Sequence, residues 1–88
     1  MSFRVSVVHE AEKVLDRLDR PAEQRVRARF VQLGVDPFDA RLSAPHADRP
    51  GIRRSRVGGW RVLFTVDREA KVIYILTVDT RGQVYKHS

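Results

Sequence analysis

The sequence predicts an α+β domain in which two N-terminal helices pack on one face of a mostly antiparallel, twisted sheet. Three observations lead to this prediction. A short alternating segment opens the chain, two segments with helical periodicity follow it, and three strand-length apolar runs occupy the C-terminal half. One domain over residues 1–88 is expected, because a chain of 88 residues can bury one modest core.

The first strand and the two helices follow from the spacing of apolar residues. Phe3, Val5 and Val7 alternate with polar neighbours, which is the period of a strand. From His9 onward the spacing becomes helical, and the apolar stripe consists of Ala11, Val14, Leu15 and Leu18. The stripe of the second helix consists of Ala22, Val26, Phe30 and Leu33. Pro21 suits the first turn of that helix, and Gly34 is a plausible stop signal.

The C-terminal half contains the remaining strands. Residues 35–51 include three prolines and a glycine without a clear period, which indicates an irregular connection. Strand-like runs follow at residues 52–57, 60–66 and 72–78. The turns between them are Gly58-Gly59 and residues 67–71.

The composition excludes several kinds of site. The chain has no cysteine, so it has neither a disulfide nor a thiolate metal site. Its three histidines are scattered at positions 9, 46 and 87, and we expect no metal and no cofactor. The apolar runs are too short for a membrane span, and the first ten residues lack the pattern of a signal peptide. We therefore expect a cytoplasmic protein without a membrane partner.

The positive charge is concentrated in one half of the chain. The net charge is +6, but residues 1–48 contain eight Lys/Arg and eight Asp/Glu, so the whole excess lies in residues 49–88. This asymmetry favours a basic face for nucleic acid or another polyanion. A solvated basic face in a protein that prefers Arg to Lys is the plainer alternative.

The segment RRSRVGGWRV, residues 53–62, predicts how some of this charge is arranged. Gly-Gly between two strand-like runs is typical of a two-residue hairpin, which would place Arg56 opposite Arg61. Because side chains alternate between faces, Arg54, Arg56 and Arg61 would share a face with Leu63. The opposite, apolar face would carry Trp60, Val62, Phe64 and Val66.

Two arginines directly opposite each other repel, at a cost of roughly 0.2–1 kcal/mol. Without a compensating carboxylate, such a pair persists more readily if an anion binds between its members. Phosphate fits best, because the planar guanidinium can bind it with two hydrogen bonds. Alternatively, both side chains extend into solvent at little cost.

The C-terminal segment DTRGQVYKHS adds further candidates. Arg81 follows the last predicted strand, and Tyr85 comes four residues later. A tyrosine beside a basic groove can stack on a base or bond to a phosphate. It could equally be a half-buried residue that fixes the tail. His87 is a speculative acid or base with a pKa near neutral, or simply a histidine in a tail.

These residues resemble a known family. The element order, the segment V-G-G-W-R-V-L-F-x-V from Val57 to Val66 and the segment R-x-x-x-Y from Arg81 to Tyr85 are similar to the RelE/ParE superfamily of type II toxins. The resemblance covers nearly the whole chain. Two segments depart from the family pattern, namely Asp79-Thr80 and the loop RLSAPHADRPG at residues 41–51.

The resemblance implies a function and a set of site residues. RelE-like members are metal-independent endoribonucleases that cut mRNA in the ribosomal A site through attack of a 2′-hydroxyl, and so inhibit translation. The implied catalytic residues are Arg61, Arg81, Tyr85 and Arg56. The implied RNA-binding residues are Arg54, Arg53, Lys86 and His87. The expected partners are mRNA on the ribosome and an acidic antitoxin that forms a hetero-oligomer with the toxin. Alternatives are a ParE-like inhibitor of DNA gyrase and a non-catalytic member that binds an antitoxin.

Overall fold

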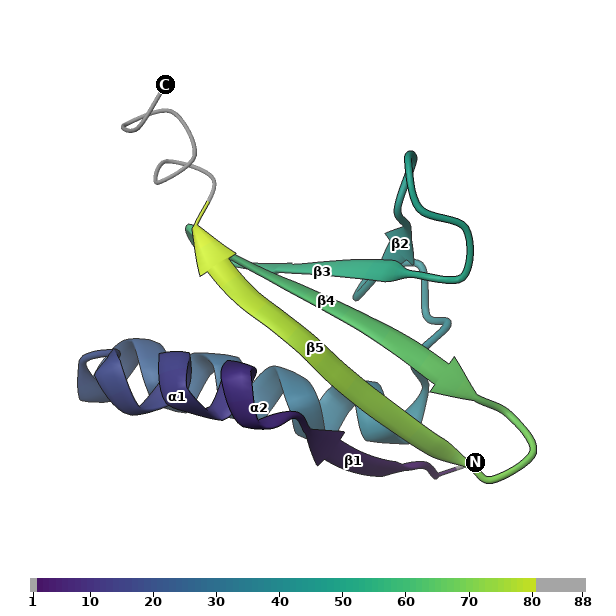
Figure 1. Cartoon of the computed structure of the whole chain (residues 1–88), viewed down its shortest axis with the longest axis horizontal. Coiled ribbons are helices and arrows are strands. Elements are labelled where there is room, and N and C mark those ends of the chain that lie inside the picture. The colour runs from purple at the N-terminus through teal and green to yellow at the C-terminus, as the bar shows by residue number, and fades with distance from the viewer. Residues whose placement is uncertain (1, 81–88) are drawn as a thin grey trace.

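The structure is a computed structural model that describes residues 2–80 and contains a five-stranded sheet with both helices on one side (Figure 1). This arrangement confirms the predicted α+β class. The elements in chain order are β1 (Arg4–Val7), α1 (His9–Arg17), α2 (Arg20–Val35), β2 (Ala44–Pro45), β3 (Arg53–Val57), β4 (Trp60–Asp67) and β5 (Val72–Thr80).

The sheet has the strand order β1-β5-β4-β3-β2, so the N-terminal strand lies at one edge and the hairpin β3–β4 lies toward the other. β1 pairs with β5 in parallel, and the other three pairs are antiparallel. The prediction of a mostly antiparallel sheet is therefore confirmed. The sequence did not predict β2, because a two-residue strand that ends in proline carries no alternating pattern.

The second helix begins where local chemistry favours a start, whereas α1 follows Val8 and has no side-chain cap. Asp19 caps α2, since its Oδ1 accepts a hydrogen bond from the backbone N–H of Ala22 at 2.9 Å. Pro21 occupies the first turn, as predicted. Arg27 of α2 joins the two helices, because it donates hydrogen bonds to Glu12 of α1 at 2.6 Å and to Glu23 at 2.9 Å. Both helices are thus held at fixed positions on the same face of the sheet.

Gly34 has a different role from the one predicted, since α2 continues to Val35. The glycine instead permits a close approach between α2 and the start of β1. The backbone N–H of Phe3 donates to the carbonyl oxygen of Gly34 at 2.6 Å. A Cβ on residue 34 would lie 3.1 Å from the backbone oxygen of Phe3. The close approach of the Phe3 backbone therefore favours glycine at position 34.

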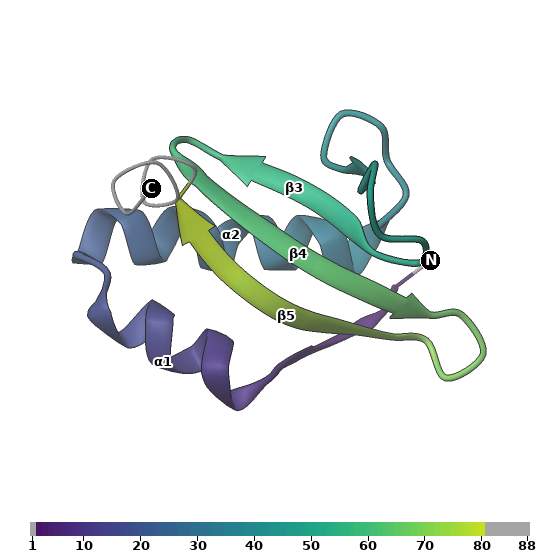
Figure 2. The same cartoon turned by 45° about the horizontal axis from the view of Figure 1, so that its top comes forward.

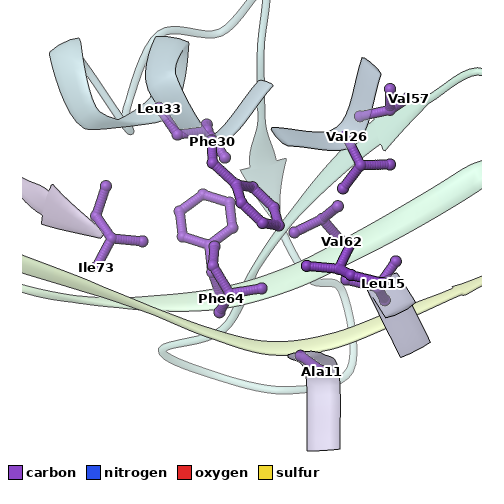
Figure 3. Close-up of a cluster of buried hydrophobic side chains, with 11 residues drawn as sticks. Ala11, Leu15, Val26, Phe30, Leu33, Val57, Val62, Phe64 and Ile73 are labelled. Atoms are coloured by element: carbon purple, nitrogen blue, oxygen red, sulfur yellow. The ribbon is translucent and has the colours of Figure 1, made fainter. Parts of the chain in front are cut away.

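The core lies between the helices and the sheet (Figure 3). Both helix stripes contribute to it, together with the predicted apolar side of the hairpin; Val62 and Phe64 are fully buried. The buried cluster consists of Ala11, Leu15, Val26, Phe30, Leu33, Val57, Val62, Phe64, Ile73, Ile75 and Val78. No helix among residues 2–80 is long and apolar enough to cross a membrane. The core occupies one side of the sheet, and the helices leave the other side uncovered (Figure 2).

A β-bulge in β5 changes which residues face the core. Leu63 pairs with Thr77 and Phe64 pairs with Ile75, so Leu76 has no partner of its own on β4. Ile75 and Val78 are both buried as a result, although they are three residues apart. Without the extra residue, strict alternation would turn Asp79 toward the helices. The bulge instead places Asp79 on the uncovered face.

Candidate nucleic-acid interface

Three of the predicted arginines lie together on the uncovered face of the sheet. Arg56 pairs directly with Arg61 across the hairpin, and Arg54 pairs with Leu63 two positions along. The predicted register is therefore confirmed. Since Val57 and Val62 face the core, the alternation of side chains puts Arg54, Arg56 and Arg61 on the other side. We call these three residues the arginine face.

The hairpin turn explains why this pairing is fixed. Gly58 has a φ of +59°, and Gly59 is not among the residues with positive φ. A positive φ at the first of two central residues is typical of a type II′ turn, which favours glycine at that position. The turn closes β3 on β4 with Val57 opposite Trp60. The register of the arginines thus depends on the backbone of Gly58.

The structure corrects one premise about these arginines, because a carboxylate does compensate the pair. Asp79 of β5 lies directly opposite Arg61. The Nε and Nη2 atoms of Arg61 donate hydrogen bonds to the two carboxylate oxygens of Asp79 at 3.1 and 3.2 Å. Both side chains are partly buried. An anion is therefore not needed to explain why Arg56 and Arg61 lie side by side.

Two arginines of the face have no such partner. The side chains of Arg54 and Arg56 make no hydrogen bond or ion pair with any residue from 2 to 80. Within the same described part of the chain, the Nη1 atom of Arg61 also makes no hydrogen bond. The arginine face therefore offers three sets of N–H donors to a ligand. Leu63, which shares this face, is buried.

Arg53 does not belong to the arginine face. It pairs with Phe64, so its side chain starts on the opposite side of the sheet. There its guanidinium lies 5.1 Å from the ring centre of Phe38 and bonds to the hydroxyl of Ser43 at 3.1 Å. Burial lowers the pKa of Arg53, and repulsion from nearby Arg68 lowers it further. Arg53 was predicted to bind RNA together with Arg54, but these contacts hold its side chain on the opposite side of the sheet from Arg54.

Four of the predicted site residues lie outside the described residues, namely Arg81, Tyr85, Lys86 and His87. The described chain ends at Thr80, which pairs with Trp60 next to the hairpin turn. In residues 2–80 there is no group of three or more side chains that could hold a metal ion.

Sequence reasoning missed Arg29, which lies beneath the arginine face on α2. Its Nη1 atom donates to the hydroxyl of Ser55 and to the backbone oxygen of Arg56, both at 2.9 Å. Arg29 stands three residues after Val26 and four before Leu33, so it falls on the buried stripe of the helix. A charged residue within an apolar stripe is the signal that could have revealed it.

The comparisons with known proteins agree with this fold. Residues 5–85 match the family described as the ParE toxin of the type II toxin–antitoxin system parDE. Because the match covers most of the chain, the protein belongs to this family, within the RelE/ParE superfamily of toxins. It is therefore a toxin of a toxin–antitoxin system. No curated protein sequence matches the chain significantly.

Solved structures of RelE proteins are also similar. A chain of the archaeal RelE–RelB complex from Pyrococcus horikoshii has a TM-score of 0.78 and 25% identity over 94% of this chain and 99% of its own. A chain of the toxin–antitoxin complex RelBE2 from Mycobacterium tuberculosis has a TM-score of 0.77 and 26% identity over 92% and 100%. The isolated RelE toxin of E. coli shares the fold, with a TM-score of 0.77 and 17% identity over 98% and 94%.

Proposed function

We propose that this toxin is a metal-independent endoribonuclease that cleaves mRNA on the ribosome and so inhibits translation. One observation carries the proposal: the hairpin register sets Arg56 opposite Arg61, with Arg54 on the same uncovered face. Guanidinium groups on a fixed sheet suit a phosphate, since each can donate two parallel hydrogen bonds.

The reaction starts with attack of an RNA 2′-hydroxyl on the adjacent phosphorus. The bond to the 5′-oxygen of the next nucleotide breaks, which leaves a 2′,3′-cyclic phosphate and a 5′-hydroxyl. Negative charge builds on the phosphoryl oxygens in the transition state, and fixed cations stabilise it. Arg61 and Arg56 supply these cations, and Arg54 positions the neighbouring backbone.

Arg61 can bind a phosphate without releasing Asp79. The carboxylate occupies Nε and one N–H of Nη2, and the Nη1 donors point elsewhere. Asp79 therefore orients the guanidinium and reduces its repulsion with Arg56. Arg81 and Tyr85 remain predicted members of the same site, with Arg81 as a further cation and Tyr85 as a group that stacks on a base or helps to activate the 2′-hydroxyl.

Two observations support the alternative, a toxin that inhibits DNA gyrase. The matching family is described as the ParE toxin. In addition, the Asp79 carboxylate lowers the net charge beside Arg61. A gyrase inhibitor would need a binding surface but no group that stabilises a phosphoryl transition state.

Cell-free translation with purified toxin separates the two activities. We expect new mRNA ends, each with a 5′-hydroxyl, that appear only when ribosomes are present. A parallel reaction contains supercoiled plasmid and DNA gyrase. Intact mRNA together with gyrase-dependent DNA breaks would contradict the ribonuclease proposal and establish the alternative.

An antitoxin is the second proposed partner. The similar structures from P. horikoshii and M. tuberculosis are toxin–antitoxin complexes. We expect an acidic antitoxin segment that covers the arginine face, forms a hetero-oligomer with the toxin in the cytoplasm and blocks RNA. Co-purification of the toxin with the product of an adjacent reading frame would test this partnership.

A further inference from the structure

A small pocket adjoins the arginine face at the edge of the sheet. It has a volume of about 210 Å³, and four of its lining residues are arginines: Arg29, Arg41, Arg54 and Arg56. The rest of its lining comes from residues 40–44, which lead into the edge strand β2. The pocket therefore joins a helix, a loop and the arginine face.

Arg29 is fixed in the wall of this pocket. Its Nη1 atom bonds to Ser55 and to the backbone oxygen of Arg56, and its Nε atom bonds to Gln32 at 3.0 Å. Ser55 is almost completely buried and donates in turn to the backbone oxygen of Leu42 at 2.7 Å. Among the described residues no acceptor is bonded to Nη2 of Arg29. These donors are thus held in place before any ligand arrives.

Arg41 lies on the loop side of the pocket and is also oriented. Asp39 accepts hydrogen bonds from its Nε at 3.2 Å and its Nη2 at 2.9 Å. These bonds lower the pKa of Asp39, and that carboxylate stays ionised. Asp39 balances one of the four positive charges, and the other three arginines have no carboxylate partner among residues 2–80. The pocket is therefore strongly cationic.

We propose that this pocket binds a backbone phosphate of the RNA, at a position next to the phosphate held by Arg56 and Arg61. The inference rests on the proposed function, and it assigns Arg29 and Arg41 as RNA-binding residues. Arg54 and Arg56 line the pocket and also belong to the arginine face, so they connect the two phosphate positions. The RNA strand then runs from the hairpin turn toward the edge strand β2.

Size and charge select a phosphate over other ligands. The volume is below the roughly 300–1,000 Å³ of pockets that enclose drug-sized molecules, so a whole nucleotide does not fit inside. The positive charge of the lining arginines repels metal cations and attracts oxyanions. Contacts between arginine side chains and phosphates position the RNA backbone on the protein and do not distinguish between bases.

Binding of uncleavable RNA tests the pocket directly. The probes are fluorescent 2′-O-methyl oligonucleotides of two and six nucleotides, which lack the attacking 2′-hydroxyl, and the readout is anisotropy at several salt concentrations. We expect Arg41→Ala to weaken binding of the hexamer by about fivefold to tenfold and to leave the dinucleotide unchanged. The slope of log K against log salt should become shallower by about 0.7, the value for one phosphate on a single strand.

Arg4→Ala is the matched control, because it removes one exposed arginine from β1 at the opposite edge of the sheet. It should change the affinity for the hexamer by less than about twofold. The proposed phosphate site would be overturned if Arg41→Ala and Arg4→Ala reduced the affinity for the hexamer equally. It would also be overturned if Arg41→Ala weakened binding of the dinucleotide as much as binding of the hexamer. The binding assay needs no cleavage, so it tests the pocket independently of the ribonuclease activity. If the pocket binds RNA but the toxin leaves mRNA intact, only the proposed ribonuclease activity is refuted.

Discussion

At the scale of single residues, Asp79 determines how the arginine face behaves. Its carboxylate binds Arg61 through two hydrogen bonds and offsets the repulsion between Arg61 and Arg56. The same carboxylate lowers the positive potential that the arginine face presents to an anion. We therefore expect Asp79 to stabilise the fold and to weaken the binding of an anion at the same position.

Asp79→Asn should separate these two effects. The substitution removes the charge and keeps the shape, so Arg56 and Arg61 repel without compensation. We expect the free energy of unfolding in urea to fall by about 0.5–1 kcal/mol. Binding of 2′-O-methyl RNA at low salt should become tighter. Weaker binding by a folded Asp79→Asn variant would contradict this account, since it would show that the carboxylate itself helps to hold RNA.

At the scale of elements, the hairpin turn and the β5 bulge together build the arginine face. The turn places Arg56 opposite Arg61, and the bulge at Leu76 rotates Asp79 onto the same side. Neither element contributes a functional side chain of its own. Both position side chains through the conformation of the backbone. At Gly58, the contribution of that conformation to stability can be measured by substitution.

Gly58→Ala and Gly59→Ala form a matched pair of substitutions. An added Cβ would meet nothing within 4 Å at either position, so the two differ in backbone conformation. Because φ is +59° at Gly58, we expect Gly58→Ala to lower the free energy of unfolding by about 1–3 kcal/mol. Gly59→Ala should change it by less than about 0.5 kcal/mol. Urea denaturation measures both, and equal costs would refute the type II′ turn.

At the scale of the whole molecule, the core and the arginine face lie on opposite sides of the same sheet. Both helices lie on one side of the sheet (Figures 1 and 2). The strand register places Arg54, Arg56 and Arg61 on the other side. Arg29 connects the helices to the sheet, since it lies on α2 and donates hydrogen bonds to residues of β3.

Two valines of α2 test where this core ends. Val26 is completely buried and Val31 is 69% exposed. We expect Val26→Ala to lower the free energy of unfolding by about 2–3 kcal/mol, because buried methyl groups are lost and a cavity remains. Val31→Ala should change it by less than about 0.5 kcal/mol. Thermal or urea unfolding provides the comparison, and similar losses would mean that α2 packs with another face toward the sheet.

Much of this fold could be predicted, because periodicity reports burial directly. The order of the main elements, both helix stripes and the Gly58-Gly59 register follow from local patterns. The bulge was harder to predict, and its only local signal is the change of spacing from Ile73 and Ile75 to Val78. The edge strand β2 and the role of Gly34 depend on contacts between distant segments, which local patterns do not report.

The candidate site was predicted in part. Arg54, Arg56 and Arg61 were predicted to share one face of the sheet. This prediction needs only the local sequence, because side chains alternate between the two faces of a hairpin. The pairing of Asp79 with Arg61, in contrast, depends on the bulge in β5, which lies outside the hairpin. The charge distribution along the sequence did not point to Arg29 and Arg41, which line the proposed phosphate pocket, because both lie in the half of the sequence that is neutral overall.

The rate of mRNA cleavage by Arg61→Ala tests the central claim most directly. The measurement is cell-free translation with mapped mRNA ends, and it compares wild-type toxin, Arg61→Ala and the control Arg4→Ala, all checked for folding. We expect Arg61→Ala to cleave at least about tenfold more slowly than wild type and Arg4→Ala to cleave at the wild-type rate. A folded Arg61→Ala variant that cleaves as fast as wild type would contradict the role of the arginine face in catalysis.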